Sequence, residues 1–355
     1  MIDLMKSVIP YISGLYTLPW IVVGFIATII LSRIFSPTKV EAVMKKIANI
    51  VLYLFVPPLV FRIFLDTPLS AKEGVFAVVS TFTIGLMYVI AYVYAVSYNK
   101  KSDVSETNKT LFTKTMITSQ GRSTAFIGGV MLAVPSWGVP AGIFMAVYGI
   151  FIFAIVPVIL GKLDKQGSSS NVTKSPLPWI LRAYPWFFAV AVLAGFIVQK
   201  TVALTTTQMG SWGVIIKFYT SLTIPLALYY VGSGIHPSDM KLSEIKILFG
   251  ITKEEDGHHW SWVRHIFIMT TMVTPIIITI IFLILMNIKA LNFPSEWFAV
   301  SVINSILPIT SINIFLVPYG IDKRATVHSI TWSTIFCVPI VIILVPVLSK
   351  LLGQM

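Results

Sequence analysis

Two apolar segments carry most of the residues that could bind a small polar molecule. Near 115–134 and near 296–318, polar, glycine and proline residues interrupt long apolar runs. Glycine and proline weaken a helix and free backbone N–H and C=O groups, and polar side chains add further hydrogen-bonding groups. We therefore expect a substrate-binding site where the two segments meet. Its predicted lining is Arg122, Ser123, Thr124, Gly128, Gly129, Asn304, Ser305, Pro308, Thr310 and Ser311.

Arg122 has the strongest potential for chemistry in this set. A charge deep in a membrane span costs at least about 2.5 kcal/mol, and such residues usually face a cavity or a partner. Arg122 could therefore attract or bind an anionic substrate. It could equally lie one turn inside the cytoplasmic end of its span, which Lys114 would mark, with its side chain reaching the headgroups. The other polar residues could serve helix packing, but polar content and helix breaks coincide in both segments, which favours a site.

The remaining reactive groups favour neither catalysis nor a metal site. His328 could carry a proton, although a hydrogen-bonded histidine near the membrane interface fits its position better. The stretch 254–259 mixes acidic residues and histidines without helical ligand spacing, so we expect a solvated loop. The one cysteine, Cys337, excludes disulfides. Because no H-E-x-x-H motif and no acidic pair in an apolar span occur, we expect no enzyme, no metal and no cofactor.

The composition requires a lipid environment around these segments. Hydrophobic residues make up 56% of the chain and charged residues 11%, with a mean hydropathy of +0.87. Soluble domains carry about 25% charged residues, so this chain cannot cover a soluble surface. The net charge of +12 could suggest nucleic-acid binding. The basic residues lie at the ends of apolar segments, however, which is the distribution of membrane topology and predicts a bilayer as partner.

The apolar runs predict ten membrane spans, each of about 20 residues. They lie near 15–34, 44–65, 74–97, 115–134, 138–160, 177–199, 211–234, 263–287, 296–318 and 324–349. Loops from odd to even spans hold roughly three times as many basic residues as the other loops. By the positive-inside rule, these loops are cytoplasmic and both termini are extracytoplasmic.

The spans divide into two halves that carry helix-breaking residues at matching positions. A Ser-, Gly- and Lys-rich cytoplasmic linker, 163–176, separates a first five-helix repeat, 1–162, from a second, 177–355. An odd number of spans per half inverts the second repeat in the membrane. Helix breakers recur in the second and seventh spans and in the fourth and ninth. Paired interrupted segments of this kind are typical of transporters that work by alternating access.

Motifs in these spans follow the order found in one known family. They are Asn49 with PPLVF at 57–61, STAFIGGV at 123–130 with Gly138, IPLA at 224–227 with Gly232, LPIT at 307–310 with YGID at 319–322, and Pro339. This series spans nearly the whole chain. It resembles the auxin efflux carrier family, which includes plant auxin exporters and bacterial malonate-type permeases, within the bile acid symporter-like superfamily.

The resemblance implies an all-α polytopic membrane protein with a 5+5 inverted repeat, in which broken helices 4 and 9 cross. It also implies scaffold helices 1, 2, 6 and 7, transport helices 3–5 and 8–10, a homodimer in the plasma membrane, and elevator-type export of organic anions. Two departures bear on the chemistry. Ser123 and Val130 replace the family's fourth-helix Asn and Pro, so Gly128-Gly129 should form the break. No acidic residue lies inside a span, unlike the plant proteins or the sodium site of the bile acid symporters.

Three alternatives remain beside an organic anion exporter. A sodium-coupled symporter of the bile acid type is disfavoured by the missing carboxylate. A membrane receptor or sensor with a transporter fold usually carries an added soluble domain, which this chain does not show. An intramembrane enzyme lacks the groups for hydrolysis.

Overall fold

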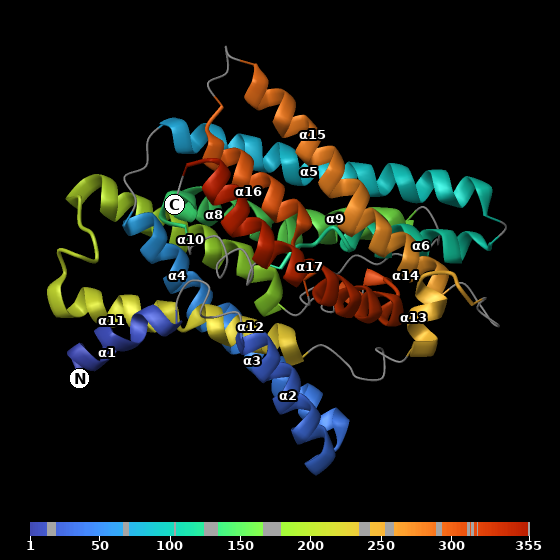
Figure 1. Ribbon diagram of the computed structural model, residues 1–355, viewed down its shortest axis with the longest axis horizontal. Helices are drawn as coiled ribbons and strands as arrows, with labels where there is room; N and C mark the ends of the chain where they lie inside the picture. Colours follow the sequence, from blue (N-terminus) through green and yellow to red (C-terminus); the bar gives the residue numbers. More distant parts are fainter. Residues whose placement is uncertain are drawn as a thin grey trace.

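The computed structural model of the protein is built from helices joined by short connections (Figure 1). It describes residues 1–12, 19–66, 71–102, 104–123, 134–165, 179–233, 242–252, 259–288, 293–310, 313, 316–317 and 319–353. No β-strand occurs within these ranges.

The α-helices are α1 Ile2–Val8, α2 Pro19–Ile34, α3 Pro37–Ile50, α4 Val56–Leu65, α5 Ala71–Lys101, α6 Glu106–Thr118, α8 Gly138–Ile150, α9 Val156–Lys165, α10 Trp179–Val202, α11 Gly210–Ser221, α12 Thr223–Ser233, α13 Leu242–Leu248, α14 His259–Ile268, α15 Thr274–Asn287, α16 Ser295–Ile306 and α17 Lys323–Leu351. Short 3-10 helices span Ile9–Ile12 (η1) and Pro135–Trp137 (η5), and π-helices span Val51–Phe55 (η3), Phe151–Ile155 (η6) and Met269–Val273 (η8).

The all-α prediction is confirmed, and the chain is an all-α membrane protein. Among the described residues, four helices are long and apolar enough to cross a membrane: Ala71–Lys101, Gly210–Tyr230, His259–Asn287 and Lys323–Leu351. Shorter apolar helices accompany them, and helix falls within every predicted span, although the range 115–134 is helical only to Thr118 in its described part. The ten crossings, the inverted repeat and the boundaries of its halves stay predictions.

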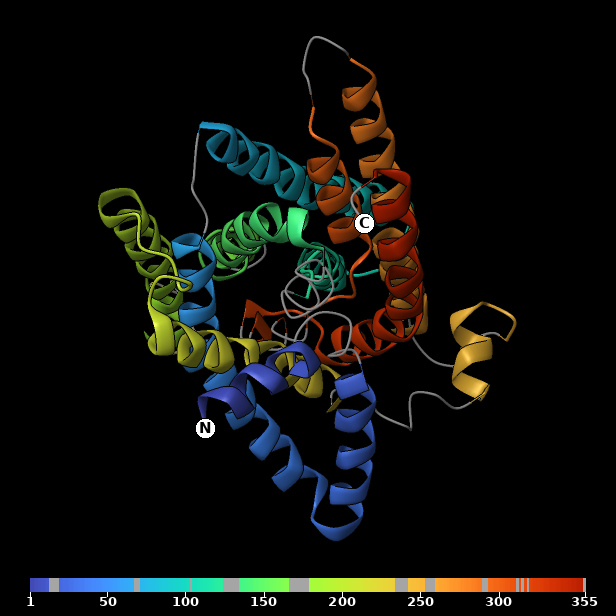
Figure 2. The same cartoon turned by 60° about the vertical axis from the view of Figure 1, so that its left-hand side comes forward.

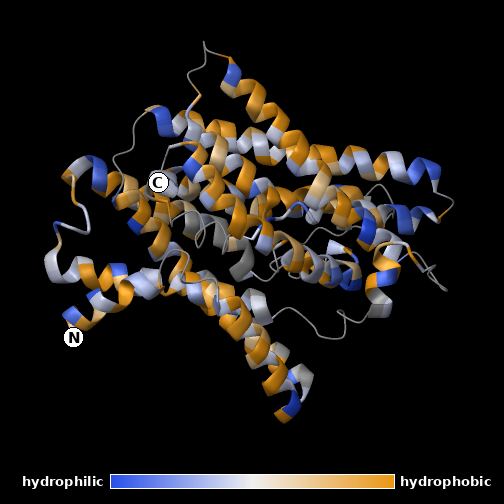
Figure 3. Cartoon of the chain, in the orientation of Figure 1, coloured by the Kyte–Doolittle hydropathy of each residue, from blue (hydrophilic) through white to orange (hydrophobic). Residues whose placement is uncertain are grey.

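The helix bundle exposes apolar side chains on its outside and buries polar side chains within a largely apolar core. α2 and α3 project together from the other helices, which surround a central region (Figure 2). Large apolar side chains such as Phe82, Val93 and Ile280 are exposed, whereas Asn304 and Thr331 are fully buried. Apolar residues run along the outer helices α2, α5 and α15 (Figure 3). The apolar exterior fits a bilayer, because lipid solvates apolar side chains and polar groups must find partners inside.

Prolines explain the π-helices among the described elements. η3, η6 and η8 are each followed by one residue and then by a proline: Pro57, Pro157 and Pro275. Proline has no N–H, so the carbonyl four residues earlier loses its helical partner. A π-helix shifts the pattern by one residue and accommodates this loss without ending the helix. The sequence therefore bends and widens three apolar helices while keeping them continuous.

Glycines bring two pairs of helices into backbone contact. α2 packs along α12, and α4 packs along α10. A Cβ at Gly24 of α2 would overlap the carbonyl oxygen of Tyr229, and one at Gly232 of α12 would overlap that of Ile21. At Gly195 of α10, a Cβ would come within 2.6 Å of the Phe61 carbonyl oxygen. Small residues at such crossings are the usual basis of close helix packing in membranes.

A second group, α5, α6, α8, α14, α15, α16 and α17, is held together by contacts within the group, and α8 also contacts α4 and α10. α5 contacts α6 and α8, α14 contacts α17, and α15 contacts α16. The breaks in α6 and α16 thus lie within this second group of helices, not in the group formed by α2, α4, α10 and α12.

Candidate functional site

Two interrupted helices meet end to end inside the bundle. α6 ends at Thr118 and is followed by a turn at Ser119 and Gln120 before the chain extends, and α16 ends at Ile306 and is followed directly by extended chain. The two extended segments then pair as a short antiparallel bridge between Arg122 and Ile309. The Ser123 N–H donates to the Pro308 carbonyl at 2.9 Å, and the Thr310 N–H donates to the Gly121 carbonyl at 2.7 Å. Backbone groups that the helices can no longer satisfy are thereby paired across the crossing.

The break in the second segment follows from its proline, as the sequence predicts. Pro308 lacks an N–H, and α16 ends just before it. In the first segment α6 already ends at Thr118, an interruption before Gly128-Gly129 that the sequence did not predict. Gly121 lies at the closest approach: its Cβ would meet Asn313 Oδ1 at 2.6 Å and the Thr118 carbonyl oxygen at 2.9 Å. The break at Gly128-Gly129 itself lies outside the described residues.

Arg122 lies at this crossing with its side chain fully buried. Its guanidinium donates to the Leu307 carbonyl at 3.2 Å, to the Thr270 carbonyl at 3.0 Å and to Gln120 Oε1 at 3.4 Å. The interpretation that Arg122 reaches the lipid headgroups is therefore wrong. Lys114 does not mark an exposed helix end either, because its side chain is 1% exposed and its Nζ donates to the Tyr319 carbonyl at 2.9 Å.

The carbonyls that hold Arg122 are those that the helices leave without a partner. Leu307 follows the last turn of α16, where carbonyls have no intrahelical donor. In η8, the Thr274 N–H bonds the Met269 carbonyl, and the next residue is Pro275, which has no N–H. The Thr270 carbonyl consequently accepts from Arg122. One guanidinium thus joins the end of α16 to the π-helix η8, which lie far apart in the sequence.

Helix dipoles account for a buried cation whose described partners are all neutral. α6 and α16 both direct their C-terminal ends toward the crossing. A helix C-terminus carries a partial negative charge and stabilises a cation near its last turn. Tyr148 of α8 completes the arrangement, since its hydroxyl donates to the Gln120 carbonyl at 2.7 Å and accepts the Arg122 N–H.

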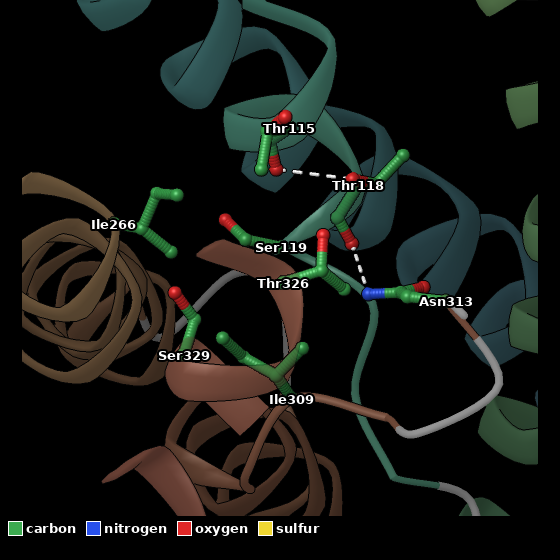
Figure 4. A pocket seen from close by; sticks show the side chains of 8 residues that line it. All are labelled: Thr115, Thr118, Ser119, Ile266, Ile309, Asn313, Thr326 and Ser329. Atoms are coloured by element: carbon green, nitrogen blue, oxygen red, sulfur yellow. Dashed lines mark hydrogen bonds between the residues drawn. The ribbon is translucent and has the colours of Figure 1, made fainter. Parts of the chain in front are cut away.

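A narrow polar cleft adjoins the crossing (Figure 4). Its lining is Thr115, Thr118, Ser119, Ile266, Ile309, Asn313, Thr326 and Ser329, and in this conformation these residues leave no room for a water molecule between them. The cleft therefore lies between α6, α14, the start of α17 and the extended segment after α16. Ligand pockets commonly measure about 300 to 1,000 Å³, so this cleft is closed in the present conformation and must open to accept an organic solute.

The hydroxyl groups of the cleft differ in what they can offer a ligand. Thr118 donates to the Lys114 and Thr115 carbonyls at 3.1 and 3.0 Å, and Thr326 donates to the Asp322 carbonyl at 2.6 Å. Their hydrogens are therefore engaged, which leaves lone pairs as acceptors. The Ser329 hydroxyl is buried and makes no hydrogen bond within the described residues. It can both donate to and accept from a bound molecule.

The structure places the predicted site residues unequally. Arg122, Ser123, Pro308 and Thr310 form the crossing itself. Asn304 and Ser305 are buried in α16, where their side chains donate to the Val300 and Val302 carbonyls, and neither lines the cleft. Thr124, Gly128, Gly129 and Ser311 lie outside the described residues.

The predicted lining includes none of the eight cleft residues. Thr115, Thr118 and Ser119 are three and four residues apart, and Thr326 and Ser329 are three apart, so each set shares one helix face. A polar face of this kind on an apolar helix was a signal that could have revealed them. His328 is buried next to them in α17, and its Nδ1 lies 2.8 Å from His259 Nε2. Of the predicted loop 254–259, His259 is the first residue of α14, and 254–258 lie outside the described residues.

The chain matches no protein-family model and no curated protein.

Proposed function

We propose that this protein is a secondary transporter that exports a small organic anion across the plasma membrane by alternating access. The observation that carries the proposal is the crossing of two broken helices beside a polar cleft. Free backbone groups in a membrane interior are tolerated only in protein or around a cavity, and carriers place their substrate sites at such crossings. The predicted site residues Arg122, Ser123, Pro308 and Thr310 belong to this crossing, and we extend the site to the cleft.

Charge supports an anion as the solute. Two cationic side chains, Arg122 and Lys114, are buried close to the cleft, and the described partners of Arg122 are neutral oxygens. The two described ion pairs, Lys72–Glu296 and Lys109–Glu106, do not involve Arg122. A positive potential in a low-dielectric interior attracts a negative solute. The acceptor-rich hydroxyls of the cleft suit an anion that also carries a hydroxyl or N–H donor.

The packing of the helices supports a moving part and a fixed part. The helices of the first, second, sixth and seventh predicted spans form the glycine-packed pairs α2–α12 and α4–α10, while the broken helices belong to the other group. An elevator-type carrier needs such a division into a scaffold and a transport unit. Export as the direction, the homodimer and the elevator motion come from the resemblance to the auxin efflux carriers.

Transport by proteoliposomes tests this proposal. The panel contains radiolabelled aromatic carboxylates that carry an N–H and radiolabelled hydroxy-dicarboxylates. Proteoliposomes that contain the purified protein should take up at least one of these anions with saturable kinetics. Ser329→Leu should lower this uptake by about tenfold or more, because the larger side chain fills the cleft, whereas Ser329→Ala should retain most of it. The proposal fails if no panel member is transported, or if Ser329→Leu transports as well as Ser329→Ala.

A further inference from the structure

The guanidinium of Arg122 occupies a cage of oxygen atoms. The Leu307 and Thr270 carbonyls and the Gln120 amide oxygen lie 3.0–3.4 Å from its nitrogens. Two hydroxyls surround the same amide: Thr274 Oγ1 donates to Gln120 Oε1 at 3.2 Å, and Gln120 Nε2 donates to Thr270 Oγ1 at 3.4 Å. The cage thus joins α6, η8, α15 and the end of α16.

This kind of cage is normally a site for a mobile cation. Carbonyl, amide and hydroxyl oxygens are the ligands that hard cations take. In carriers with broken helices, unwound carbonyls and half-helix C-terminal ends coordinate the Na⁺ that is transported together with the substrate. Here the Thr270 carbonyl, freed by Pro275, and the Leu307 carbonyl, freed by the end of α16, would be such ligands. In this protein the guanidinium of Arg122 occupies the position that a bound cation would take.

We infer that Arg122 is a tethered substitute for a coupling cation. This inference rests on the proposed transport function, because a coupling cation has a role only in a carrier. A bound Na⁺ would add its charge to the site only when its concentration is high enough. Arg122 supplies one positive charge permanently, and its delocalised, weakly hydrated guanidinium is suited to a buried position. Anion binding at the neighbouring cleft then needs no cation from solution.

Two properties follow for the protein as it stands. Its stability and its anion uptake do not respond to replacement of Na⁺ or K⁺ by choline at constant ionic strength. Removal of the guanidinium leaves an unoccupied set of oxygens, which a small cation can fill. A cation that binds only the folded protein raises the unfolding midpoint in a saturable manner.

Thermal unfolding of purified variants tests the cage without a transport assay. The Arg122→Ala variant should lose roughly 5 °C or more of its midpoint, because the carbonyls lose their donor. Free guanidinium at low millimolar concentration, or Na⁺ at higher concentration, should restore part of the loss with saturation, and choline should not. Arg122→Lys should need no added cation. If Arg122→Ala yields no folded protein, Arg122→Gln, which keeps a donor without the charge, should show the same rescue.

Arg62→Ala is the matched control, because Arg62 also donates to a backbone carbonyl, that of Lys217, away from the crossing. This variant should show no cation-dependent gain. The inference is overturned if Na⁺ stabilises the wild-type protein with saturation, or if no cation rescues folded Arg122→Ala or Arg122→Gln. If the wild-type protein transports no anion of the panel but the Arg122 variants still show cation rescue, the proposed transport function fails and the cation cage stands.

Discussion

Replacement of Gly24 by alanine should destabilise the protein by about 2–3 kcal/mol or more. Gly24 lies in α2 directly against the backbone of α12, and an added Cβ would overlap the Tyr229 carbonyl oxygen. Backbone cannot turn away as a side chain can, so α2 must separate from α12 and give up part of their contact. Overpacking of a tight core usually costs about 1–3 kcal/mol, and a backbone obstacle lies at the upper end. The midpoint of thermal unfolding, followed by tryptophan fluorescence, would report this loss.

The sign of the stability change in Gly24→Ala shows whether the backbone clash or the higher helix propensity of alanine dominates. Alanine in place of a helical glycine ordinarily gains about 0.5–1 kcal/mol. Gly74 of α5 provides the control, because nothing lies within 4 Å of the Cβ that would be added there. Gly74→Ala should therefore be neutral or slightly stabilising. Equal stability of Gly24→Ala and Gly74→Ala would disprove the close packing of α2 on α12.

Gly121→Ala should have the second large effect, in this case on transport. The added Cβ would come within 2.6 Å of Asn313 Oδ1, and Asn313 donates from Nδ2 to the Thr118 carbonyl at 2.6 Å. The substitution should displace Asn313 and push apart the two segments that meet at the crossing. We expect a loss of anion uptake of about tenfold or more, equivalent to about 1.4 kcal/mol in the transport barrier.

A second substitution shows whether Asn313 is the obstacle. Gly121→Ala combined with Asn313→Ala removes the clashing amide, so the double variant should transport better than the product of the two single effects. Gly161→Ala in α9 is the control for the glycine change, since no atom lies within 4 Å of its added Cβ. Strictly additive effects of the two substitutions would show that the two residues do not oppose each other.

The local breaks could be predicted from the sequence because proline acts on its own helix. Pro308 ends α16, and Pro225 lies just after the junction of α11 and α12 at Leu222. Each removes a backbone donor at a fixed distance along the chain, so the residue type alone indicates the place. Apolar composition likewise predicts an all-α membrane protein, since a spanning segment must satisfy its own backbone.

The environment of Arg122 could not be predicted in this way. Its acceptor in η8 is 148 positions away in the sequence, and that carbonyl is free only because Pro275 diverts the helical hydrogen bonds. The same limit applies to Lys114, which was expected at a helix end and is buried against Tyr319. The end of α6 at Thr118, where Gly121 and Asn313 meet across the two segments, was likewise not predicted from the glycines at 128 and 129. Contacts between distant segments decided these positions.

One-sided thiol labelling of the cleft tests most directly whether the crossing is an alternating-access site. Cys337 is the chain's only cysteine and is buried, so Cys337→Ala gives a cysteine-free background for Ser329→Cys. In oriented vesicles, a small membrane-impermeant anionic thiol reagent should modify position 329 when added to either side in separate experiments, and a transported anion should slow both reactions. Modification from one side only under all conditions, or none, would contradict the account.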